Sequence, residues 1–273
     1  YAWPLMRPHL GQRPPFSANG HSGAPWLGER GSALRPDGLW PDNDVVPNPD
    51  FQVRQYPITA ISTPVRKTPT EFDEEGMVFV LGDEKDEVLA GTRPAQPLVI
   101  RSNVGDGTRV ILTSEIEGTN PGNNNERTNA GEEFSKVNMH IHFVQFDPQA
   151  SDGVITGMSY EQSVRPYATE GRTLLSGTAI GTTTIEVDHL NRLRPGIWIG
   201  IGLGEGMAGE RMVTEIRKIE DLVGNTMIVL NEPLDLEHAA GEAVGVEFVQ
   251  YAWYSDVDTG TVFWHDHVNF KSW

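Results

Sequence analysis

The chain has 273 residues, enough for one large or two medium-sized domains, and its 29 glycines and 19 prolines favour a loop-rich β protein over a helical bundle. With 38 acidic against 21 basic residues, the formal net charge of -17 argues against binding to nucleic acid or to anionic lipid. The lack of cysteine excludes disulfides, cysteine–zinc sites and thiol nucleophiles, and the lack of a long apolar run excludes a membrane-spanning helix.

Residues 1–50 are rich in proline and glycine, and they carry Trp3, Trp26 and Trp40. Proline interrupts both strands and helices, whereas tryptophan is costly to leave in water. We therefore expect an irregular arm that packs over another surface, with a disordered tail as the alternative. Because the chain begins at Tyr1 and no signal-peptide pattern follows, we also expect a processed form or a piece of a longer protein.

Short runs rich in β-branched and aromatic residues begin near residue 51, and Gly, Asn and Asp bound them. This pattern predicts an all-β fold, which we interpret as an antiparallel β-sandwich. A polar stretch at 118–134 indicates a long loop. The predicted strands are 51–62, 76–83, 96–103, 107–118, 137–147 and, much later in the chain, 251–268.

Residues 173–249 form a separate group of short strand-like runs, divided by Gly, Pro and Asn. We interpret this group as a small β-barrel-like domain inserted into the larger one. The predicted organisation is therefore an arm at 1–50, a first part of the main domain at 51–172, the insert at 173–249 and the rest of the main domain at 250–273.

One motif in this insert matches a dinucleotide-binding fingerprint, with Gly204, Gly206 and Gly209 at G-x-G-x-x-G spacing after an apolar run. A nucleotide-binding domain needs several parallel strands joined by crossover helices, and the insert has no room for them. We therefore interpret the motif as a glycine-rich turn.

Two His-x-His pairs are the strongest chemical signal: His140 with His142, and His265 with His267. Residues i and i+2 of a strand face the same side, so each pair presents two imidazoles together. Imidazole suits Zn, Cu, Ni and Fe, and two such pairs could hold more than one ion. The alternative is a chance pair on a surface or in a core. We interpret the remaining histidines as structural or solvated: His9, His21, His189 and His238.

Two longer motifs surround these pairs. The first is His140-Ile-His142 followed by 151–153 (Ser-Asp-Gly) and 160–162 (Tyr-Glu-Gln), and the second is 259–267 (TGTVFWHDH). They resemble the first two copper motifs of the multicopper oxidases, most closely those of large bacterial enzymes related to manganese oxidases. The resemblance covers roughly 96–172 and 250–270. His142 and His265 are 123 residues apart. The family's spacing is much shorter, and the insert at 173–249 accounts for the excess.

The resemblance implies a cupredoxin-like domain whose histidines bind the type 2 and type 3 copper ions of a trinuclear cluster. His140 matches the type 2 ligand, and His142, His265 and His267 match type 3 ligands. Asp152 matches a carboxylate beside the cluster, which would deliver protons during O2 reduction. A simple turn residue is the alternative for Asp152. We expect Asp266 to face away from the metal, because neighbouring strand residues alternate sides.

The departures from the family pattern also carry predictions. Without cysteine the chain cannot form a blue type 1 copper site, and its motifs supply four of the eight histidines that a full cluster needs. We therefore expect one part of a larger oxidase, extracellular or in the periplasm or cell envelope. Its partner would be the remainder of the enzyme, and O2 would accept electrons from a small substrate: Mn(II), Fe(II) or a phenol. The alternatives are a non-catalytic copper-binding or structural subunit, and a mononuclear metal hydrolase or cupin-like enzyme.

Overall fold

The computed structural model describes residues 52–74, 76–116, 136–146, 151–154, 162–255 and 257–267. The predicted arm at 1–50, the predicted loop at 118–134, and Tyr160 with Glu161 lie outside these residues. Strands dominate the described part of the chain, which confirms the all-β prediction. Its helical segments are α1 (Lys85–Leu89) and two 3-10 turns, η4 (Gly82–Glu84) and η6 (Tyr167–Thr169). None of the described helices has the length and apolar character needed to cross a membrane.

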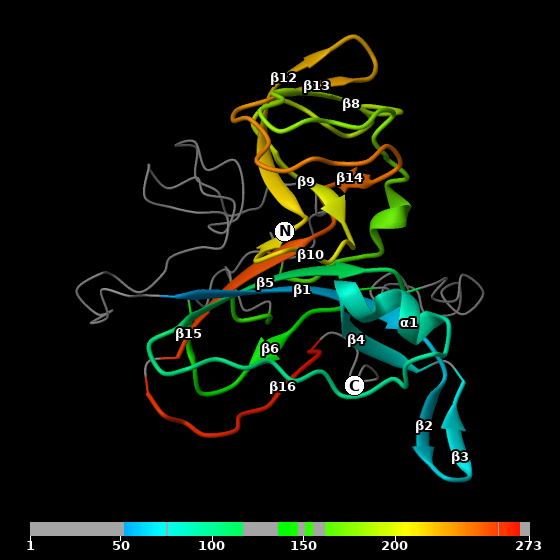
Figure 1. Cartoon of the computed structure of the whole chain (residues 1–273), viewed down its shortest axis with the longest axis vertical. Helices are drawn as coiled ribbons and strands as arrows, with labels where there is room; N and C mark the ends of the chain where they lie inside the picture. The colour runs from blue at the N-terminus through cyan, green and yellow to red at the C-terminus, as the bar shows by residue number, and fades with distance from the viewer. Residues whose placement is uncertain are drawn as a thin grey trace, which may run out of the picture.

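A five-stranded sheet forms the centre of the molecule (Figure 1), with the strand order β4-β1-β5-β15-β7. These strands are β1 (Val53–Ser62), β4 (Met77–Leu81), β5 (Gly107–Ser114), β7 (Gln145–Phe146) and β15 (Val249–Tyr254). β1 and β5 are parallel, which departs from the antiparallel expectation because the connection between them crosses over through β2–β4 and α1. β15 is buried along its whole length, since other layers cover both faces of the sheet.

One face of this sheet packs against a short antiparallel pair, β6 (His140–Ile141) and β16 (Trp264–His265). The core between the two layers combines aliphatic and aromatic side chains, and the edge of one ring of the Phe79–Trp264 pair meets the face of the other, with centroids 5.2 Å apart. This packing gives the fold its sandwich character. The buried members of the core are Ile58, Ala60, Phe79, Val110, Leu112, Ile116, Val137, Met139, Ile141, Val164, Val249, Tyr251 and Trp253.

A second five-stranded sheet, in the order β14-β9-β12-β13-β8, stands beyond the opposite face of the main sheet (Figure 1). Its strands are β8 (Thr184–Glu186), β9 (Trp198–Leu203), β12 (Glu215–Val223), β13 (Met227–Leu230) and β14 (Ala243–Gly245). The sheet is not a closed barrel, but one segment bridges its two edges: the Leu174 N–H donates to the Glu242 carbonyl and the Leu175 N–H to the Glu186 carbonyl. This sheet encloses its own cluster of buried aliphatic side chains.

The glycine motif of this second unit occupies turns, which confirms its interpretation. Gly204 (φ 81°) follows β9, and Gly209 (φ 66°) separates β10 (Met207–Ala208) from β11 (Arg211–Met212). At Gly206 an added Cβ would collide with the carboxylate of Asp83, which accepts a hydrogen bond from the Met207 N–H at 2.9 Å. The motif therefore contacts η4 and helps to hold the second unit against the main domain.

Three of the predicted strands differ from the structure. The predicted strand at 251–268 is divided into β15 of the main sheet and β16 of the facing pair. Residues 96–103 form no strand, because the backbone N–H and C=O of Arg101 bond to the Tyr56 hydroxyl (3.1 and 2.6 Å) instead of a neighbouring strand. The predicted strand at 137–147 is divided into β6 and β7. Phe143 lies between them with φ 63°, a left-handed conformation that interrupts the strand, and the chain leaves the β16 layer and joins β15 in the main sheet.

A hairpin of β2 (Val65–Thr68) and β3 (Glu71–Asp73) projects from the sandwich (Figure 1). An ion pair between Arg165 and the buried carboxylate of Glu247 joins the segments that enter and leave the second unit. The Glu170 carboxylate joins them too, since it accepts from the Val246 N–H at 3.1 Å and pairs with Arg172 of its own segment at 2.8 Å.

Candidate metal centre

The pairing of β6 with β16 brings the two His-x-His pairs together. His140 lies directly opposite His265, and the His142 N–H donates to the Phe263 carbonyl at 3.2 Å. Opposite residues of an antiparallel pair point to the same face, and so do residues two apart on one strand. One face of this pair therefore carries the imidazoles, and the other carries Ile141 and Trp264 toward the core.

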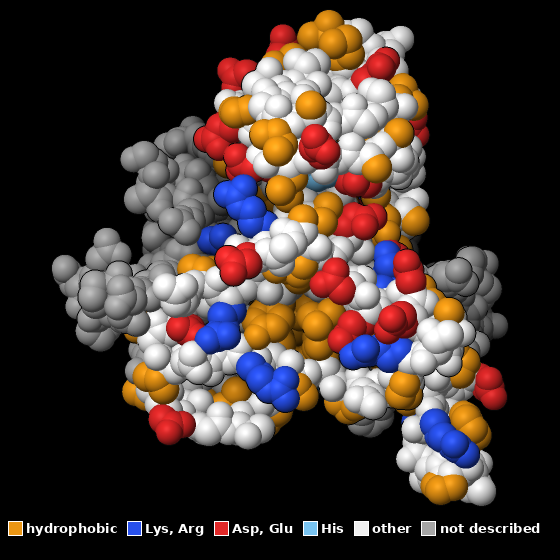
Figure 2. Space-filling view, in the orientation of Figure 1, with side chains coloured by type: hydrophobic (Ala, Val, Ile, Leu, Met, Phe, Trp, Pro, Cys, Tyr) orange, Lys and Arg blue, Asp and Glu red, His pale blue; other side chains and the backbone are white. Residues whose placement is uncertain are grey.

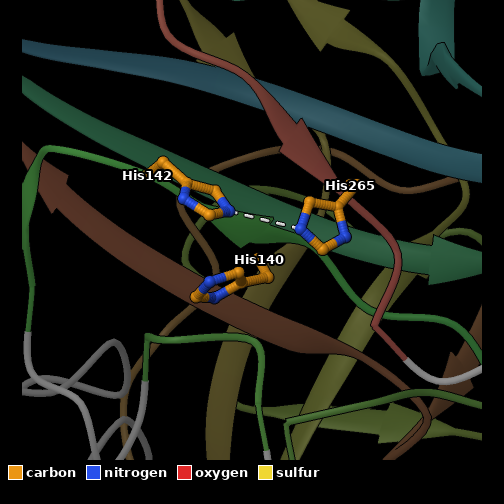
Figure 3. A group of neighbouring side chains, drawn as sticks. All are labelled: His140, His142 and His265. Carbon is orange, nitrogen blue, oxygen red and sulfur yellow. Dashed lines mark hydrogen bonds between the residues drawn. The ribbon is translucent and has the colours of Figure 1, made fainter.

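The imidazoles of His140, His142 and His265 form one group in which a ligand nitrogen from each lies within 4.8 Å of the others. Figure 3 shows the three rings turned toward a common space, with His142 and His265 facing each other across the two strands. The ring of His267 is adjacent, with its centroid 5.5 Å from that of His140 and 5.6 Å from that of His265, but its residue is exposed and outside the three-histidine group.

The hydrogen bonds of the Nδ1 atoms assign the tautomers of two rings. His140 Nδ1 lies 2.6 Å from the Asp152 carbonyl, and His265 Nδ1 lies 2.8 Å from the Asp266 carbonyl. A carbonyl oxygen accepts only, so each Nδ1 carries the hydrogen and, in the neutral ring, each Nε2 keeps its lone pair. Such second-sphere bonds orient metal-binding histidines in proteins.

The Nε2 atoms of His142 and His265 lie 3.3 Å apart. Two nitrogens that each bind one ion at about 2.0–2.1 Å would subtend an angle of about 107° at this separation, close to the tetrahedral value. At this distance either a hydrogen on His142 Nε2 donates to the lone pair of His265 Nε2, or a cation lies between two lone pairs that would otherwise repel. The separation therefore fits an ion shared by these two rings, and His140, in the same group, is the candidate third ligand.

The electrostatics of the cluster keep His142 in the form that binds metal. Burial lowers the pKa of His142, and the neighbouring imidazoles of His140, His265 and His267 lower it further. At Asp152, burial raises the pKa of the carboxyl group and outweighs the opposing effect of the imidazoles around it. Its Oδ1 lies 3.0 Å from His140 Nδ1, so its side chain and its backbone both contact the same ring.

The turn at 151–154 approaches the backbone at the start of β6 very closely, and this approach places Asp152 against His140. Gly153 has φ 74°, and a Cβ at this position would collide with the Met139 carbonyl. The Gly153 N–H donates to the Gln162 side chain at 2.8 Å. Ser151 fastens the turn to the main sheet, since its hydroxyl accepts from the Ala252 N–H at 3.0 Å.

Asn138 and Asp266 lie behind the histidines, and each is 2% exposed. They connect the two strands of the site with each other and with the turn at 151–154. The Asn138 N–H donates to the Asp266 carboxylate at 2.9 Å, and the Asn138 side-chain oxygen accepts from the His267 N–H at 2.7 Å. The Asn138 side-chain nitrogen also donates to the Gly153 carbonyl. Asp266 thus points away from the imidazole face, as the alternation along its strand predicts.

Two exposed phenylalanines border the imidazole face. The ring of Phe263 is tilted over that of His142 with their centroids 4.1 Å apart, and Phe143 lies 6.1 Å from the same imidazole. Phe143 is 72% exposed and Phe263 is 59% exposed. A strained, exposed aromatic residue beside a cluster of ligand side chains is typical of a functional site.

The structure thus gathers His140, His142 and His265, sets His267 beside them, and places Asp152 in contact with His140. His238 lies elsewhere, buried between Glu215 and Glu242, while His9 and His21 lie outside the described residues. Sequence analysis missed Asn138 and Phe143. A polar residue two positions before His140 is a weak signal, and nothing in the sequence marks the left-handed conformation of Phe143.

Comparison with known protein families finds no family model that matches the chain, and comparison with curated proteins finds no match either. The assignment of a function therefore depends on the motifs and the geometry.

Proposed function

We propose that this chain supplies part of the copper-binding site of a multicopper oxidase, in which the histidines form half of the type 2/type 3 cluster. The observation that carries the proposal is the convergence of His140, His142 and His265 on one face, with His267 adjacent. The order and context of the two His-x-His motifs support the same function.

The donor set fits copper. Two Nε2 atoms have lone pairs fixed by their Nδ1 hydrogen bonds, and neutral imidazole is a preferred ligand of copper as well as of zinc, nickel and iron. Copper would supply the one-electron chemistry by which members of this family reduce O2 to water with electrons from a metal ion or a phenol. Type 1 copper would have to come from another part of the enzyme, because the chain has no cysteine.

The chain's own residues would orient the ligands and handle protons. Asp152 holds the His140 ring through its backbone carbonyl and its carboxylate, and a partly buried carboxyl group with a raised pKa can pass a proton to a neighbouring group. Asn138 fixes the register between the two strands that carry the histidines.

A second candidate is a mononuclear metal site with no redox turnover, as in a copper-binding or structural subunit. The 3.3 Å separation of two Nε2 atoms within a group of three histidines favours it, because this arrangement can hold one ion with a fourth position open.

Metal titration of the chain tests both candidates. We expect Cu(II) to bind the wild-type chain and binding to be lost in His142→Ala and His265→Ala, while the matched variant His189→Ala, outside the site, binds as wild type does. Equal binding by all four proteins would contradict any metal role for these histidines.

Oxygen uptake separates the two candidates. In the complete enzyme, His142→Ala is expected to abolish O2 consumption while substrate still reduces the type 1 copper. If metal binds to the chain but no assembly containing it consumes O2 with Mn(II), Fe(II) or a phenol, the mononuclear site is the better description.

A further inference from the structure

A cavity of about 220 Å³ lies between the main sheet and the second unit. Gln55 of β1, Arg109 of β5 and Gln250 of β15 line it from the main sheet, and Arg211 of β11 and Arg217 of β12 line it from the second unit. Binding pockets form preferentially where two domains meet. No histidine of the candidate metal centre lines this cavity.

The amide side chains of the cavity have unused hydrogen-bonding capacity. Gln250 is only 5% exposed, yet its side chain makes no hydrogen bond within the described part of the chain. The Gln55 side-chain oxygen accepts one long bond from the Met212 N–H (3.4 Å), and its N–H groups have no acceptor among the same residues. The two amides line the cavity, so a bound molecule that bonds to them directly would take the place of water there.

The charge of the cavity is positive in an acidic protein. Three arginines line it against two carboxylates, Glu215 and Asp235. Glu215 is already engaged, since it accepts from Arg217 at 2.5 Å and lies 3.0 Å from the buried His238. Figure 2 shows basic side chains gathered where the second unit meets the sandwich.

Arg211 is the guanidinium most available to a ligand. Its side chain is 61% exposed, and its single ion pair within the described residues, to Asp235, is long at 4.0 Å. A guanidinium presents a planar fork of donors that matches the oxygens of a carboxylate or a phosphate.

We propose that this cavity binds a small hydrophilic molecule that carries an oxyanion. Arg211 and Arg109 would bind the oxyanion, and Gln55 and Gln250 would bond to its polar groups. A volume of about 220 Å³ is below the range of about 300–1,000 Å³ typical of small-molecule pockets, so the ligand is of small-metabolite size. This site is independent of the proposed copper function.

Isothermal titration calorimetry of the metal-free chain tests the proposal, with inorganic phosphate and citrate as separate probes at constant ionic strength. We expect saturable binding of at least one probe at one site per chain. Because hydrogen bonds to charged groups are strong, Arg211→Gln and Gln250→Leu should each weaken binding by about tenfold or more. Phosphate and citrate arms distinguish a phosphate-bearing ligand from a carboxylate-bearing one.

The matched control is Arg194→Gln, which removes the same charge from an exposed position outside the cavity and should bind as wild type does. If Gln250→Leu fails to fold, the exposed Arg211→Gln still decides the result. The proposal is overturned if both probes bind more weakly than about 1 mM, or if Arg211→Gln and Arg194→Gln change binding equally.

Discussion

The strand pair that carries the histidines and the second unit are stabilised in different ways. β6 and β16 contain two residues each, and polar side chains such as Asn138 and Asp266 hold them in register. The second unit has strands of up to nine residues around an aliphatic cluster of its own. We therefore expect the candidate site to be sensitive to changes in a few polar and glycine residues, and the second unit to changes in buried aliphatic volume.

The largest effect is expected at Gly153. Gly153→Ala adds a Cβ that collides with the Met139 carbonyl, so we predict a loss of more than about 4 kcal/mol in the free energy of unfolding, together with loss of copper binding. Gly91→Ala is the control, because Gly91 has a similar φ of 69° but nothing within 4 Å. It should cost only about 1–2 kcal/mol from the left-handed conformation, as urea unfolding will measure. Equal costs would show that the close approach of the turn does not matter.

Shortening a buried side chain in the aliphatic cluster of the second unit should leave the candidate metal centre intact. Ile199→Ala removes a fully buried side chain from the aliphatic cluster of the second unit and should cost about 3 kcal/mol without changing Cu(II) affinity. Met139→Ala, equally buried but adjacent to His140, should lower both stability and affinity. Thermal denaturation and metal titration of both variants check this difference. A large loss of copper affinity in Ile199→Ala would show that the two units are coupled.

The stability of the second unit should depend on pH through His238. Burial lowers the pKa of His238, but its hydrogen bonds to Glu215 and Glu242 outweigh burial and raise that pKa to about 9. The resulting stability is fully present below about pH 6.5, the ordinary value, and is lost as the pH rises through 9, up to about 3 kcal/mol in all.

Urea unfolding from pH 6 to pH 10 measures this dependence. His238→Gln should be less stable at low pH and should lose the fall in stability over this window. If wild type and His238→Gln show parallel pH profiles, another group is responsible.

The smallest effect on stability is expected at Asn138. Asn138→Ala removes the bonds from its side chain to Gly153 and His267, which should cost about 2 kcal/mol of unfolding free energy. Because partners behind the ligands orient them, copper affinity should also fall by about tenfold or more. The exposed Asn191→Ala is the matched control. Unchanged copper affinity in Asn138→Ala would limit this residue to a structural role.

Regular alternation made much of the fold predictable. The runs that became β1, β5 and β9 are β-branched and bounded by turn residues, so their pattern and their structure agree. The pattern fails at 96–103 because the Tyr56 hydroxyl, which is distant in sequence, satisfies the backbone of Arg101. It fails at 137–147 because one residue, Phe143, adopts a left-handed conformation.

The sequence predicts the ligands of the candidate site but not the residues that hold those ligands in position. Period-two spacing places each histidine pair on one face, and the resemblance indicates that the two pairs meet. The register that sets His140 opposite His265 depends on hydrogen bonds between Asn138 and 266–267, and these involve contacts more than a hundred residues apart. No local pattern encodes such contacts.

Anomalous diffraction from a crystal of the chain grown with Cu(II) tests the central claim most directly. We predict a copper peak between the Nε2 atoms of His142 and His265 and within coordination distance of His140. A fully loaded crystal whose copper lies away from all three imidazoles would contradict the account, because the convergence of these rings would then have no role in metal binding.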